Sequence, residues 1–146
     1  MPTAAKLFGA LSFAVLGWLW GHVFSASLPE GAQVGFMREI VAGVGLVAGW
    51  RVAGKGAGKG YYAAMGNGTK TGIVTAFFAL LGFGLYEMVV LSTKMRYDGP
   101  MEAVLDVFNI MLKYGRLMLT SDMIVSFVAG SVVGGWITEF AGRHWR

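Results

Sequence analysis

The strongest constraint on the fold is a run of twenty residues, 7–26, that contains no formally charged side chain. At 1.5 Å per residue, a helix of this length extends about 30 Å, which matches the hydrocarbon thickness of a bilayer. The run is longer than the apolar core of a usual signal peptide, although Ser25-Ala26-Ser27 has the small-residue pattern of a cleavage site. We interpret residues 7–26 as a first transmembrane helix.

Three further segments have the composition of membrane spans. Residues 72–92 and 123–140 are long enough to cross as helices, and we expect Gly66-Asn67-Gly68 to break the chain before the first of them. Residues 36–53 form the weakest span, because their uninterrupted apolar run, 40–50, is too short to cross alone, and a re-entrant segment is the alternative. Hydrophobic residues make up 55% of the chain and charged residues 14%, unlike a soluble domain. We predict an all-α membrane bundle of four transmembrane helices, forming one domain over residues 1–146.

A different kind of helix is predicted over residues 100–118, between the third and fourth spans. Apolar residues repeat there at three- and four-residue spacing: Met101, Val104, Leu105, Phe108, Met111 and Leu112. Polar residues repeat on the opposite side: Glu102, Asp106, Asn109, Lys113 and Arg116. This pattern is typical of an amphipathic helix, which we expect to lie in the membrane interface. Binding in a partner's groove is the alternative.

The distribution of Lys and Arg predicts the topology. One side of the predicted bundle carries seven of them: Lys6, Arg51, Lys55, Lys59, Lys70, Arg143 and Arg146. The other side carries five: Arg38, Lys94, Arg96, Lys113 and Arg116. Because cations are enriched on the cytoplasmic side, we expect both termini to be cytoplasmic.

The basic, glycine-rich segment 51–62 is expected to be a cytoplasmic loop. Gly49, Gly54 and Lys55 have the spacing of a phosphate-binding loop, but Gly56 stands where that motif needs Ser or Thr. The nucleotide interpretation therefore fails. We predict instead that the loop binds anionic lipid headgroups or an acidic partner, at about 1 kcal/mol per cation. The residues that we assign to this contact are Arg51, Lys55, Lys59 and Lys70.

The sequence resembles one known family at several places along its length. The resembling segments are Met1-Pro2-Thr3-Ala4-Ala5-Lys6, Gly49-Trp50-Arg51 with the glycines up to Gly60-Tyr61, Arg96-Tyr97-Asp98-Gly99-Pro100 with Glu102-Ala103, and Gly142-Arg143 to Trp145-Arg146. They are similar to the TrgA family, small inner-membrane proteins of alphaproteobacteria associated with tellurite resistance. The resemblance implies a phenotype and a location; it implies no catalytic or binding residue.

Pairs of glycines four residues apart predict faces where helices approach closely, within the bundle or against another protein. These pairs are Gly17 and Gly21, Gly45 and Gly49, and Gly130 and Gly134. Glu87 lies inside the third span, less than about 10 Å from its outer end, where we expect an ion pair with Arg38; a proton or ion relay is the alternative. His22 is a weak candidate for a haem or pigment ligand and is more typical of an interfacial anchor.

No catalytic constellation is evident in the sequence. The chain has no Cys, which excludes disulfides, Fe–S clusters and thiolate metal sites, and its nine Met residues are typical of apolar filler. We predict no metal and no cofactor, and we expect bound phospholipid. The resulting hypothesis is a non-enzymatic accessory protein beside a larger membrane complex, for example a photosynthetic or respiratory one. A small transporter or channel for an oxyanion or a proton-coupled solute is the alternative.

Overall fold

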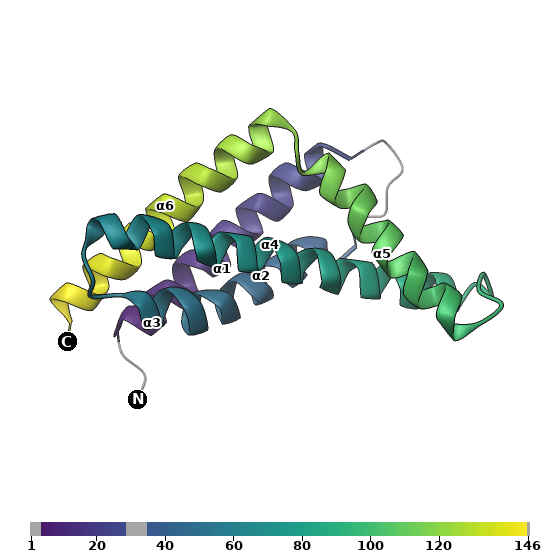
Figure 1. Cartoon of the computed structure of the whole chain (residues 1–146), viewed down its shortest axis with the longest axis horizontal. Helices are drawn as coiled ribbons and strands as arrows, with labels where there is room; N and C mark the ends of the chain where they lie inside the picture. Colours follow the sequence, from purple (N-terminus) through teal and green to yellow (C-terminus); the bar gives the residue numbers. More distant parts are fainter. Residues whose placement is uncertain (1–3, 29–34, 146) are drawn as a thin grey trace.

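The computed structural model describes residues 4–28 and 35–145, and all regular elements in those ranges are helical. In chain order they are α1 (Ala4–Ala26), α2 (Met37–Ala48), the π-helix η1 (Gly49–Ala53), α3 (Gly54–Gly56), α4 (Tyr61–Ser92), α5 (Pro100–Leu117) and α6 (Ser121–His144). The prediction of an all-α protein is confirmed for the described residues. Figure 1 shows α1 and α6 beginning and ending at the same end of the molecule, where both termini lie.

Three described helices are long and apolar enough to cross a membrane, where the sequence predicted four. They are α1, α4 and α6. The predicted second span differs because α2 ends after 12 residues, at Ala48, which makes it too short by itself. The chain stays helical beyond this point, since η1 and α3 continue to Gly56 without a gap.

The π-helical turn η1 has one hydrogen bond within the turn and one from a distant residue of α4. The backbone N–H of Gly54 bonds to the carbonyl of Gly49, the i+5 pattern that defines such a turn. The side-chain amide of Asn67 donates to the carbonyl of Ala53 at 2.9 Å. A backbone acceptor at the end of the π-turn is thus satisfied from α4.

Helices α1 and α2 pack antiparallel along a seam of glycines. A Cβ added at Gly17 would lie 2.6 Å from the Val41 carbonyl oxygen, and one added at Gly45 would overlap the Phe13 carbonyl. Farther along, Gly49 faces the backbone of Gly9 in the same way. The seam continues past α2, so that η1 and α3 also pack on α1.

Helix α4 is longer than predicted at its N-terminal end. The sequence Gly66-Asn67-Gly68 was expected to break the chain before the third span, but α4 runs through it as one helix of 32 residues. The reason is packing, because a Cβ at Gly68 would overlap the Ser131 carbonyl and one at Gly135 the Ala64 carbonyl. These glycines let α4 and α6 cross in close contact.

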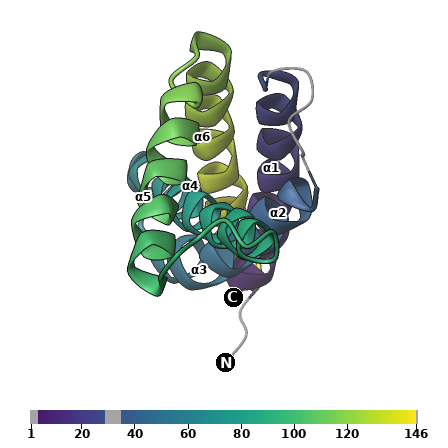
Figure 2. The ribbon, with the colours of Figure 1, turned by 90° about the vertical axis from the view of Figure 1, so that its right-hand side faces the viewer.

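Beyond this crossing, α4 and α6 diverge, and α5 closes the angle between them (Figure 1). Figure 2 shows α5 lying beside α4, against which it packs. The buried residues of α5 are Ala103, Val107, Ile110 and Tyr114. The apolar face predicted from the sequence is a different one, and most of it is exposed, with Phe108 at 59% and Leu112 at 62%. Helix α5 therefore has a packed face, a polar face and an uncovered apolar face.

Candidate functional site

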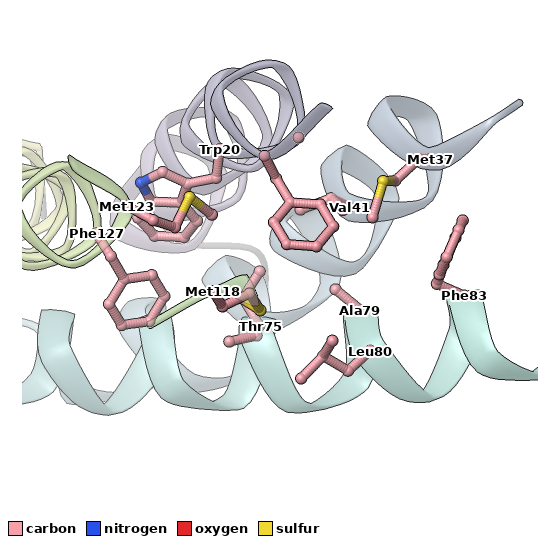
Figure 3. A pocket seen from close by; sticks show the side chains of 13 residues that line it. Trp20, Met37, Val41, Thr75, Ala79, Leu80, Phe83, Met118, Met123 and Phe127 are labelled. Carbon is pink, nitrogen blue, oxygen red and sulfur yellow. The ribbon is translucent and has the colours of Figure 1, made fainter. Parts of the chain in front are cut away.

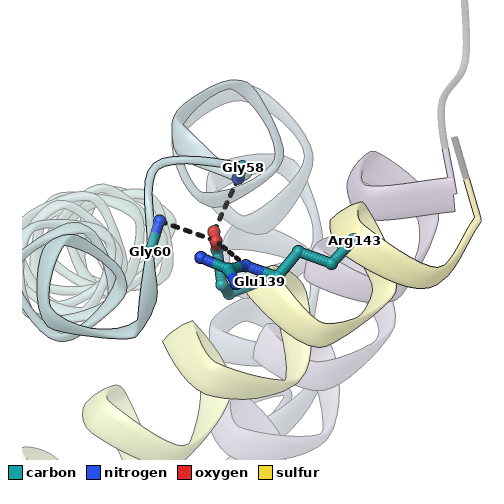
Figure 4. Close-up of polar contacts among 4 residues, drawn as sticks. All are labelled: Gly58, Gly60, Glu139 and Arg143. Carbon is teal, nitrogen blue, oxygen red and sulfur yellow. Dashed lines mark hydrogen bonds and ion pairs between the residues drawn. The ribbon is translucent and has the colours of Figure 1, made fainter.

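The most strongly organised polar group lies at the end of the molecule that holds both termini. Glu139 of α6 is 1% exposed, and its carboxylate accepts three hydrogen bonds (Figure 4). The backbone N–H of Gly58 donates to Oε2 at 2.6 Å, and that of Gly60 donates to Oε1 at 2.7 Å. The Arg143 guanidinium donates from Nε to Oε1 at 2.9 Å. We call this arrangement the Glu139 latch.

The local sequence explains the latch. Gly58 and Gly60 have φ values of +93° and +106°, in the region that side chains rarely adopt, so the turn can present both N–H groups to one carboxylate. Arg143 follows Glu139 by four residues and lies one turn away on α6. Its guanidinium also lies 5.1 Å from the ring centre of Tyr61, at the start of α4. The latch thus joins α3, α4 and α6.

The basic segment is consequently more ordered than the expected loop. Arg51 lies in η1, Lys55 in α3 and Lys59 in the latched turn, and Lys70 lies in α4. All four side chains are exposed. The same end of the molecule holds the start of α1 and the end of α6, where the rings of Phe8 and Trp145 stack at 5.2 Å. The structure therefore displays the predicted contact residues around a fixed scaffold.

A groove opens between α2–η1 and α4, close to this basic end. Its volume is about 600 Å³, and its walls are apolar except for Glu39 and Arg51. Gly43 lies in the groove with no atom near the position that a Cβ would occupy.

The expected ion pair between Arg38 and Glu87 is not formed, although both residues are described. Arg38 packs over Gly21 of α1. Glu87 instead lies near Tyr114 of α5, whose ring packs edge-on against Phe83 at 4.8 Å. Burial, and then the charge and hydrogen bond of the Glu87 carboxylate, raise the pKa of Tyr114 to about 12. The two charged residues face different neighbouring helices.

The glycine pairs singled out in the sequence lie in contacts within the chain. Gly17, Gly21, Gly45 and Gly49 lie between α1 and α2–η1. Gly130 and Gly134 of α6 face side chains of α1, including Leu16.

His22 lies near the C-terminal end of α1, with its ring stacked on Trp18 at 6.0 Å. No group of three or more His, Cys, Asp or Glu residues that could hold a metal occurs in the described ranges.

The centre of the bundle holds a cavity of about 30 Å³ (Figure 3). Three of the nine Met residues, Met37, Met118 and Met123, line it together with Trp20 and other apolar side chains. The one hydroxyl-bearing residue in its wall, Thr75, donates to the Thr71 carbonyl at 2.8 Å. The cavity has room for about two waters by volume, but its lining is apolar except for Thr75.

Sequence reasoning singled out Glu87 and missed Glu139, although Glu139 also lies inside the predicted fourth span. Its main partners are backbone groups 79 and 81 residues away, which leave no side-chain pattern. The i+4 spacing of Glu139 and Arg143 was the available signal. Gly68 and Gly135 were also missed, although Gly68 and Gly72 have the same four-residue spacing as the pairs used above.

In comparisons with protein-family models, curated proteins and solved structures, nothing matches this chain.

Proposed function

We propose that this protein is a non-enzymatic accessory protein of the bacterial inner membrane that packs beside a larger membrane complex. In this proposal the chain is TrgA-like and contributes to tellurite resistance through its association with that complex. It crosses the membrane four times, keeps both termini in the cytoplasm and binds lipid through its basic end.

The register of the helices supports four crossings. Along α1, Gly21 faces Arg38, Gly17 faces Val41 and Gly9 faces Gly49, so the chain from α2 into η1 returns along α1. Residues 37–56 would extend about 30 Å as a helix, which is enough to cross. Helices α1 and α4 both start at the end of the molecule that holds Glu139. The chain must therefore come back along α1 before α4 begins, and the continuous segment α2–η1–α3 supplies this return.

The uncovered face of α5 is the observation that carries the accessory role. The predicted glycine faces are used inside the bundle and are not left for a partner. The uncovered face consists of Met101, Val104, Leu105, Phe108 and Leu112, all exposed. The polar face of α5 borders it on one side, so it would meet a partner at the membrane surface, where an apolar stripe has a polar rim.

Association can be tested with the tagged protein extracted from native membranes in mild detergent. We expect the wild-type chain to migrate in a complex larger than the free protein and to crosslink to neighbours. The double variant Leu105→Ser/Phe108→Ser should migrate as the free protein. The matched variant Asn109→Ser/Lys113→Ser, on the polar face of α5, should stay in the complex. Migration of the wild-type chain as a free monomer would contradict the accessory role.

The link to tellurite needs a separate measurement. A deletion strain should grow less well on tellurite, and the wild-type gene but not the Leu105→Ser/Phe108→Ser variant should restore growth. Tellurite uptake and efflux should be the same in both strains if the role is accessory. A changed uptake or efflux rate would favour the transporter alternative.

A further inference from the structure

The groove between α2–η1 and α4 has the dimensions of a site for one acyl chain. Its walls include Ile40, Val44 and Val47 on one side and Val74 and Phe78 on the other. Its charged residues, Glu39 and Arg51, are twelve positions apart. Twelve helical residues extend about 18 Å, close to the roughly 15 Å depth of one leaflet's hydrocarbon.

The two ends of the groove differ in charge, and the cationic end lies at the basic end of the molecule. Arg51 is exposed and makes no hydrogen bond or ion pair with the described residues. Lys70 precedes Val74 by four residues on α4, so it lies on the face of α4 that lines the groove. The bond from Asn67 to Ala53 fixes the start of α4 beside η1, which brings Lys70 to the level of Arg51.

We propose that this groove binds one anionic phospholipid. Its acyl chain lies along Gly43, Val47 and Phe78, and its phosphate is bound by Arg51 with Lys70 nearby. Charge complementarity selects a phospholipid, because an apolar chain ending in a cation-binding anion matches an apolar groove that ends in cations. The site rests on the membrane placement proposed above and needs no partner protein.

The test uses the full chain, purified and incorporated into nanodiscs of equal parts phosphatidylglycerol and phosphatidylcholine. Lipid retained after transfer to detergent is counted by native mass spectrometry. We expect the wild-type chain to retain one phosphatidylglycerol in preference to phosphatidylcholine. Arg51→Gln should weaken that preference about fivefold, the effect of one cation near the headgroups.

A matched pair of glycine variants tests the acyl-chain path. Gly43 and Gly66 both lie in helices with open space where a Cβ would stand, and only Gly43 lines the groove. Gly43→Leu should fill the groove and reduce retention of both lipids severalfold, whereas Gly66→Leu should leave retention unchanged. Thermal unfolding of each variant reports whether it folds, and if Gly43→Leu does not, Arg51→Gln still decides the headgroup site.

Three outcomes would overturn the site. They are equal retention of both lipids by the wild-type chain, equal loss in the two glycine variants, and retained detergent in place of lipid. These outcomes are separable from failure of the accessory role, because they are measured on the purified chain. A protein that loses its partner complex but keeps one phosphatidylglycerol would retain this site and lose the proposed function.

Discussion

At the scale of single residues, we expect the Glu139 latch to stabilise the folded protein. Glu139→Ala removes the acceptor of two backbone N–H groups and the partner of Arg143, at a side chain that is 1% exposed. Leaving such groups unpaired costs about 3 kcal/mol. We expect the free energy of unfolding in mild detergent to fall by about that amount. Glu139→Gln, which keeps one acceptor oxygen, should lose less.

The control for this prediction is Glu39→Gln, because the Glu39 side chain is exposed and makes no hydrogen bond with the described residues. Glu39→Gln should change the free energy of unfolding by less than about 0.5 kcal/mol. An equal loss in the two Gln variants would mean that the latch adds no stability.

At the scale of helices, two glycines of α2 give opposite predictions. Gly45→Ala forces a methyl group onto the Phe13 carbonyl of α1, so the two helices must separate. Overpacking of this kind costs about 1–3 kcal/mol. Gly43→Ala meets open space and gains helix propensity, which should stabilise the protein by about 0.5–1 kcal/mol. Thermal unfolding of both variants measures the difference, and equal melting temperatures would contradict the close approach of α1 and α2.

We expect a hydrogen bond at the turn between α4 and α5 to make the stability of the protein depend on pH. The Tyr97 hydroxyl donates to the Asp106 carboxylate, and this hydrogen bond raises the pKa of Tyr97 from 10.0 to about 12. Because the folded state favours the protonated phenol, this contribution to stability is complete below about pH 10. It is lost as the pH rises from there to about 12.

Titration of tyrosinate absorbance tests this assignment. In Tyr97→Phe, the titration step near pH 12 should lose one tyrosine relative to the wild-type chain, and the stability difference between the two proteins should shrink above pH 10. Asp106→Asn should return the Tyr97 step toward pH 10. If Tyr97→Phe removed a step near pH 10 instead, the hydrogen bond would not persist in solution.

Local sequence predicts some elements of this fold and not others. The long apolar runs were sufficient to predict α1, α4 and α6, because bilayer length and hydropathy are local properties. The predicted break at Gly66-Asn67-Gly68 was wrong, since glycine lowers helix propensity locally but here permits contact with α6. The apolar stripe of α5 was read as its membrane face, and the buried stripe at Val107 and Tyr114 was missed. Which face packs is decided by α4, which the local pattern of α5 does not contain.

At the scale of the whole molecule, the number of crossings is the property on which the other proposals depend. Four crossings and three crossings place the later loops on opposite sides of the membrane. Because the chain has no Cys, a single introduced Cys labels one loop alone. Three exposed positions are suitable: Ser27 after α1, Lys59 before α4 and Asp98 after α4. Each is replaced by Cys in a separate variant.

With four crossings and a cytoplasmic N-terminus, a membrane-impermeant maleimide added to intact cells should label Ser27→Cys and Asp98→Cys but not Lys59→Cys. If α2–η1–α3 turned back without crossing, Lys59→Cys would be labelled and Asp98→Cys protected. The pattern follows from the helix register, because the return along α1 carries Lys59 to the end that holds Glu139 and both termini (Figure 1). Labelling of Lys59→Cys from outside would thus overturn the four-span topology and the cytoplasmic headgroup site together.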